Sequence, residues 1–293
     1  MSKNLVRSLL ASLALSATTV AQADVMTSLT GYAGPLYFDV VGVAQGSVYS
    51  GNCGTPGACD VSPPLFSQAS HHITGSSEDA WGLFRVKGIY SDSLQSTTIW
   101  QQTSGDYLLG TYGGLIDQSA IVSGGNQQTF SSGGGLKMWN TGSLAGYNAA
   151  IADAGATLRD LTTGAVTGVD GVGTLILSAD FAGVAFSGAV GSYTNTFSAG
   201  SRQLIGNGYL NVTGGPAAGY IGRFMPDAEG ALVDVSFATT NNPGNGLPAG
   251  WTTPFLGSAV TAVPEPETYA MMLAGLSLLG FIARRRKQNQ RSV

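Results

Sequence analysis

Charged side chains are scarce in this 293-residue chain, where Asp, Glu, Lys and Arg make up only 10% of the residues. Positive charge is rarest between residues 24 and 262. This part holds six Lys and Arg against fifteen Asp and Glu, so its net charge is near −9, compared with −4 for the whole chain. An acidic surface repels phosphate backbones. We therefore predict that nucleic acid is not a partner.

Cysteine and histidine are also rare, with two residues of each. Cys53 and Cys59 enclose a five-residue loop that contains Gly and Pro, and such a pair closes readily in an oxidising compartment. We predict a disulfide between them, which the loop-entropy treatment values at about 2 kcal/mol. His71 and His72 are adjacent, so in a strand they would face opposite ways, and we expect them in a surface loop. We predict no metal site and no cofactor.

The common catalytic motifs are missing as well, since the sequence contains no HExxH, GxSxG, P-loop or EF-hand pattern. A Ser-His-Asp triad built on the two histidines would have no supporting sequence context. Two alternatives stay open, because the sequence does not show which acids face each other. Loop carboxylates could bind Ca²⁺, or two carboxylates across a cleft could hydrolyse a glycoside. The acids in turn-rich surroundings are Glu78, Asp79, Asp106, Asp117, Asp170 and Asp227.

Glycine, in contrast, is abundant, with 43 residues, about twice the usual share of ~7%. Together with many Thr and Ser residues and short alternating apolar stretches, it favours strands and turns over helices. We predict an all-β fold, an antiparallel β-sandwich or jelly-roll-like domain with Gly-rich loops. The candidate strands are residues 36–43, 81–90, 97–101, 107–112, 174–186, 192–197, 209–213 and 231–238.

One segment has helical instead of strand periodicity. Apolar residues recur there at spacings of three and four, which predicts one short amphipathic helix over about 144–161 on an otherwise β core. Four tryptophans are candidates either for the core or for sugar-binding platforms. We expect Trp139 to lie on a loop and Trp251 to pack back onto the domain. The other two are Trp81 and Trp100.

The N-terminal end has the features of a secretory signal peptide. Residues 1–23 contain Lys3 and Arg7, then an uncharged apolar stretch, and end in the small-residue cleavage pattern Ala21-Gln22-Ala23. We therefore predict export through the inner membrane. The β-rich secreted domain then spans residues 24–256.

The C-terminal end carries three features in sequence. Residues 257–266 form a linker that ends in Pro264-Glu265-Pro266, and residues 267–283 are predicted as a transmembrane helix, uncharged from 269 to 283. Those fifteen uncharged residues would rise about 22 Å, short of a bilayer core of ~30 Å. Residues 284–293 follow as a basic tail that stops transfer. By the positive-inside rule, this tail is predicted to stay cytoplasmic. It opens with Arg284, Arg285, Arg286 and Lys287.

The Pro-Glu-Pro element, the apolar run and the arginine cluster together resemble the PEP-CTERM sorting signal of Gram-negative bacteria, over residues 263 to about 287. This resemblance implies that exosortase, a membrane cysteine peptidase, recognises Pro264, Glu265 and Pro266 and cleaves near them. It also implies transient anchoring in the inner membrane through residues 269–283, followed by transfer to the cell surface or the extracellular space.

Proteins with this signal accompany exopolysaccharide production and biofilm or floc matrix. The resemblance therefore implies a non-enzymatic surface or matrix protein, structural or adhesive, with exopolysaccharide as a potential partner. A secreted polysaccharide-active enzyme and a calcium-dependent glycan-binding protein are the alternatives.

Overall fold

The computed structural model describes most of the predicted secreted domain. The described residues are 24–46, 73–74, 76, 78–124, 126–153, 158–182, 184–186, 189–191, 193–198, 203–221, 225–226, 232–241, 251, 253–261, 274 and 276–277. Several predictions fall outside them: the signal peptide, the Cys53–Cys59 disulfide, the loop with His71 and His72, the Pro264-Glu265-Pro266 element and the basic tail.

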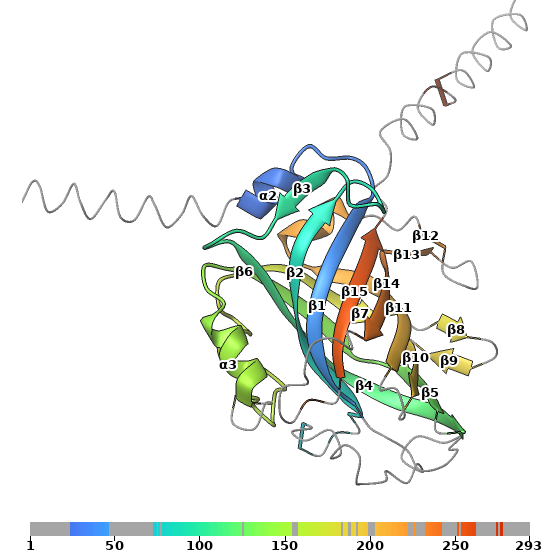
Figure 1. The fold of residues 1–293 in the computed structure, drawn as a ribbon. Coiled ribbons are helices and arrows are strands. Elements are labelled where there is room, and N and C mark those ends of the chain that lie inside the picture. The colour runs from blue at the N-terminus through green and yellow to red at the C-terminus, as the bar shows by residue number, and fades with distance from the viewer. Residues whose placement is uncertain are drawn as a thin grey trace, which may run out of the picture.

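Eight antiparallel strands form a closed barrel (Figure 1). Their order is β4-β6-β7-β11-β14-β15-β1-β2, and β2 pairs with β4 to complete the ring. The strands are β1 (Leu36–Gly46), β2 (Ala80–Tyr90), β4 (Tyr107–Ser123), β6 (Gly135–Thr141), β7 (Thr174–Phe181), β11 (Gln203–Gly214), β14 (Val235–Asn241) and β15 (Thr253–Thr261).

Shorter elements extend or flank this ring. β5 (Asn126–Ser132) pairs with β4, and β10 (Tyr193–Ser198) joins β5 to β11, so that β4 and β11 are also linked on a second path. β3 (Thr98–Gln101) pairs with β2. Two small hairpins complete the strands, β8 (Val184–Phe186) with β9 (Ala189–Gly191) and β12 (Met225–Pro226) with β13 (Leu232–Val233).

The β-rich content agrees with the sequence prediction, but the sandwich or jelly-roll architecture is wrong, because the main sheet closes on itself. Two strands that the sequence did not reveal make the closure possible. β6 lies between β4 and β7, and β15 lies between β14 and β1. β15 also continues the sheet to Thr261, past residue 257, where we expected the linker to begin.

The helix predictions also need correction. α3 (Ala145–Asp153) is shorter than the predicted helix over 144–161, since Arg159 already pairs with Val166 in an isolated bridge. In the part of the chain that the structure describes, no helix is long and apolar enough to span a membrane, which contradicts the predicted C-terminal transmembrane helix. The physical reason is length, because the fifteen-residue run is shorter than a bilayer core.

Glycines opposite aromatic residues shape the barrel interior. Gly42 pairs with Phe255, Gly82 with Tyr112, and Gly110 with Phe84. At each of these glycines an added Cβ atom would lie under 3.0 Å from the facing ring. The rings thus lie over neighbouring glycines, which explains in part why the chain is rich in this residue.

Helices cover one end and one side of the barrel (Figure 1). At one end, α2 (Asp24–Leu29) and the 3₁₀ helix η1 (Pro216–Tyr220) insert Val25, Leu29 and Ala217 into the core. On the outer side, Tyr147 and Ala150 of α3 pack over outward-facing apolar residues of the barrel. These are Val43, Trp81, Leu83 and Leu109.

Candidate functional site

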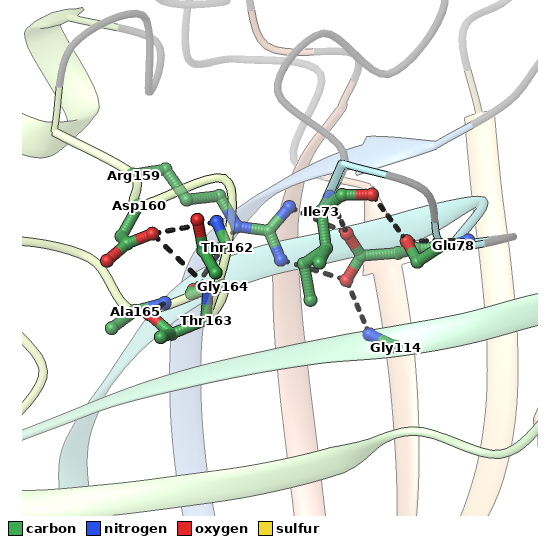
Figure 2. Close-up of polar contacts among 10 residues, drawn as sticks. Ile73, Glu78, Gly114, Arg159, Asp160, Thr162, Thr163, Gly164 and Ala165 are labelled. Carbon is green, nitrogen blue, oxygen red and sulfur yellow. Dashed lines mark hydrogen bonds and ion pairs between the residues drawn. The ribbon is translucent and has the colours of Figure 1, made fainter.

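The most elaborate polar cluster in the described residues centres on Glu78 and Arg159 (Figure 2). Two parallel bonds of 2.8 Å join the guanidinium of Arg159 to the carboxylate of Glu78. The side chains are only 2% and 1% exposed. Backbone N–H groups of Gly114 and Ile73 also donate to this carboxylate. The cluster therefore ties the start of β2 to β4 and to the loop after α3.

A tight turn after α3 directs Arg159 into this position. The Asp160 carboxylate accepts backbone N–H groups of Thr162, at 2.7 Å, and Thr163, at 3.2 Å (Figure 2). Gly164 then takes a left-handed conformation with φ of 75°, which favours glycine. Its carbonyl accepts a hydrogen bond from Nε of Arg159 at 3.2 Å. The turn thus binds Nε of the guanidinium, while Glu78 binds its two terminal nitrogens.

The guanidinium also lies over an aromatic pair. Its central carbon is 4.2 Å from the ring centroid of Trp81, a cation–π distance. Trp81 in turn packs on Trp251, with centroids 5.0 Å apart. Nε1 of Trp251 donates to the carbonyl of Ile151 in α3 at 2.8 Å. The prediction that Trp251 packs back onto the domain is confirmed, and the ion pair is continuous with the helix that covers the barrel wall.

Burial and charge act in opposite directions on Glu78. Burial raises its pKa, but the hydrogen bonds and positive charge of Arg159 outweigh this effect and lower the pKa below the ordinary value of 4.5. A general acid needs a pKa near the working pH. Because Glu78 stays ionised, inaccessible and paired, we interpret the cluster as a structural latch rather than a catalytic dyad.

The pKa of Asp170 is shifted in the opposite direction. Burial raises its pKa above the ordinary value of 3.8, although its carboxylate accepts bonds from Oγ1 of Thr111 at 2.9 Å and from the N–H of Val166. Asp170 therefore contributes stability in its protonated form, which is present below pH 3.8 and is lost as the pH rises through its folded pKa.

We expect Glu78 and Asp170 to change the pH dependence of the free energy of unfolding in opposite directions. The stability that Glu78 contributes is present above pH 4.5 and is lost as the pH falls through its lowered folded pKa. The free energy of unfolding, measured with urea between about pH 3 and pH 6, should decline as the pH falls. This decline should be smaller in Glu78→Gln. Asp170→Asn is the control and should steepen the decline, because it removes the opposing contribution. An unchanged acid decline in Glu78→Gln would contradict this assignment.

The other candidate acids are also engaged inside the domain. Asp106 accepts Nε1 of Trp100 at 2.7 Å and Nδ2 of Asn140 at 2.9 Å. Asp117 accepts the hydroxyl of Ser131 at 2.6 Å. The carboxylate of Asp79 accepts the backbone N–H of Asp117 at 2.7 Å. Among the described residues, no group of three His, Cys, Asp or Glu side chains is placed to hold a metal ion. Asp227 lies outside the described residues.

The tryptophans do not form the sugar platforms that the sequence left open. All four are buried, and Trp139 lies within β6, so its predicted place on a loop is wrong. The sequence did not reveal that Arg159 is the partner of Glu78, because 81 residues separate them. The lone arginine before Asp-x-Thr-Thr-Gly was the only local signal of an anchored turn.

Comparison with known proteins identifies the C-terminal end. Residues 262–287 match the model of the PEP-CTERM protein-sorting motif. The chain carries a PEP-CTERM sorting motif. This confirms the resemblance found in the sequence, and the motif supports an exported protein that is processed by exosortase. No curated protein and no solved structure matches the chain. The PEP-CTERM motif is thus the part of the chain that the comparisons identify.

Proposed function

We propose that this PEP-CTERM protein is a non-enzymatic structural or adhesive component of the cell surface or extracellular matrix. The match of residues 262–287 to the sorting motif carries this proposal. The motif supports export, transient anchoring at the membrane and then a surface location. In this proposal Pro264, Glu265 and Pro266 form the element that exosortase recognises, and the basic cluster from Arg284 to Lys287 stays on the cytoplasmic side.

The two prolines give a physical reason for recognition. Each fixes its own φ and lacks an N–H group, and each restricts the preceding residue to extended geometry. From the sequence we therefore expect Glu265 to be presented in a stiff extended segment, which a peptidase can bind at a low cost in ordering entropy.

The barrel supports the structural half of the proposal. The candidate acids that the structure describes are engaged in internal hydrogen bonds or in the buried latch, an arrangement that holds the fold together rather than offering a pair of acids to a substrate. A disulfide between Cys53 and Cys59 is part of the same proposal, since an exported chain meets oxidising conditions.

Sorting is tested by substituting the acid of the recognition element. We expect Glu265→Ala to leave uncleaved precursor in the inner membrane, while Glu267→Ala, a matched acid outside the Pro-Glu-Pro triplet, is processed normally. Intact mass of the wild-type protein from the medium should lack residues 1–23 and the arginine cluster. Released wild-type protein that retains Arg284–Arg286, or normal release of Glu265→Ala, would contradict the proposal.

The matrix role needs a separate test. Purified protein should be retained by the exopolysaccharide of the producing cells in a pull-down and should release no new reducing ends from it. Reducing ends that form in proportion to the amount of protein would favour the polysaccharide-active enzyme. Retention that requires Ca²⁺ and stops on chelation would favour the calcium-dependent glycan-binding protein.

A further inference from the structure

The barrel interior is not filled by its own side chains. It contains a cavity of about 170 Å³. Natural cores have few voids larger than a water molecule, and an empty cavity reduces stability roughly in proportion to its volume. A cavity this large in a barrel therefore needs an explanation, and concave apolar pockets are preferred sites for small ligands.

Inward-facing side chains confirm that this space is accessible. Phe38 of β1, Tyr112 of β4, Leu136 of β6, Phe237 of β14 and Ala259 of β15 all line the cavity. They belong to different strands around the ring, and each is only half-buried although it faces inward. Side chains of a tightly packed core would be fully buried, so these residues border open space.

Aromatic rings form one wall of the cavity. Tyr112 makes edge contacts with Phe255 and Phe181, with centroids 6.2 and 6.4 Å apart, and Phe181 contacts Phe237 at 5.8 Å. Within this chain, Tyr112 lies over Gly82 and Phe255 lies over Gly42. Ring edges and faces of this kind are suited to aromatic or alkyl groups.

The charge of the lining restricts what can bind. None of the described residues that line the cavity is charged. Its polar lining includes the neutral side chains of Gln127, Thr239 and Thr253. A carboxylate, phosphate or ammonium group would enter without an opposite charge, which is strongly unfavourable in an apolar site. The ligand is therefore neutral, and any polar group on it is of the hydroxyl, ester or amide kind.

The volume restricts ligand size. An engineered cavity of about 150 Å³ with Leu, Ile and Phe walls binds benzene. We propose that the barrel of this protein is a binding site for a small neutral apolar molecule, of the size of one substituted benzene ring or a short alkyl chain. The cavity is too small for a fused polycyclic ligand. Helices α2 and η1 cover one end of the barrel, and the lining that includes the aromatic rings and Thr253 forms the binding site.

The test compares neutral and charged probes of equal size on the purified protein. Toluene and hexan-1-ol should bind saturably with one site in calorimetric titration, and toluene at a hundredfold excess over its Kd should raise Tm by about 5 °C. Benzoate and benzylammonium share the ring but carry a charge, and they should leave Tm unchanged. Absence of saturable binding of both neutral probes, or equal binding of the charged ones, would overturn the proposal.

A cavity-filling variant locates the site. Gly257 of β15 lines the cavity, and an added Cβ atom would meet its neighbours no closer than 3.5 Å, an ordinary contact. Gly257→Leu should therefore fill the space and weaken toluene binding at least about tenfold. Thr240→Leu adds the same side chain at an exposed position of the neighbouring strand β14 that does not line the cavity, and it should bind toluene as the wild type does. Equal loss of binding in both variants would place the ligand elsewhere.

A second variant keeps the proposal testable if Gly257→Leu does not fold. Leu136→Ala enlarges the cavity and should allow naphthalene, which the wild type excludes, to bind. Naphthalene binding of equal strength in the wild type and in Leu136→Ala would contradict the assigned site.

Discussion

Arg159→Met should lower the free energy of unfolding by about 3 to 5 kcal/mol, the usual result of removing one partner from a buried ion pair. The substitution keeps a long unbranched side chain but leaves the carboxylate of Glu78, 1% exposed, without its positive partner. Backbone bonds from Gly114 and Ile73 remain and moderate the loss. Urea unfolding at pH 7, with the slope of the transition checked against the wild type, measures the effect.

Two comparisons separate the buried charge from other effects of this change. Lys87→Met breaks the ion pair of Lys87 with Asp39, also 2.8 Å long but with side chains 43% and 20% exposed, and should cost less than about 1 kcal/mol. Glu78→Gln combined with Arg159→Met removes both charges and should recover part of the loss. If Arg159→Met costs no more than Lys87→Met, the latch does not stabilise the barrel.

Gly110→Ala should destabilise the protein by about 1 to 3 kcal/mol, the range for overpacked cores. The added methyl group would lie under 3.0 Å from the Phe84 ring and from the carbonyl of Lys137. The ring lines the cavity and can move toward it, but the backbone carbonyl belongs to β6 and cannot move without shifting that strand. Chemical unfolding of the variant measures the loss.

Gly46→Ala is the matched control, because Gly46 is also in the barrel and an added Cβ atom there would meet nothing within 4 Å. It should be neutral, or stabilising by up to about 1 kcal/mol. A double-mutant cycle tests the cause. Phe84→Leu shortens the opposing side chain, so Gly110→Ala should cost less in that background. A cost that is the same in both backgrounds would mean that the ring is not the limiting contact.

Local sequence patterns identified much of the sheet but not its closure. The alternating stretches that correspond to β1, β2 and β14 were predicted because their side chains face two different environments. β6 was missed because it begins within a run of three glycines, Gly133 to Gly135, which resembles a loop. Gly133 and Gly134 do form a turn, with φ of 69° and 82°, and Gly135 then begins the strand.

β15 was missed for a different reason. Pro254 made residues 253–261 resemble a linker, since proline cannot donate to a strand ladder. In the structure Pro254 is the second residue of β15 and pairs with Val43 of β1, whereas pairing with β14 reaches only to Phe255. Proline is tolerated at such a strand start, so composition alone could not distinguish this strand from a tether.

The candidate site shows the same limit. Glu78 was noticed as one of several acids, but its pairing with Arg159 depends on a turn that follows α3, 81 residues further along the chain. The tryptophans were left open between core and sugar platforms, and only their packing placed all four in the core.

The richness in β strands and the PEP-CTERM sorting motif could be predicted from the sequence, because alternation and the Pro-Glu-Pro tail are local patterns. The closure of the strands into a barrel, the contact between Glu78 and Arg159 and the neutral interior cavity became evident from the folded structure. Each of these depends on contacts between distant segments, such as Leu36 with Thr261 across the β1–β15 pair. A contact between residues so far apart cannot be predicted from a short stretch of sequence, because it depends on the closed sheet.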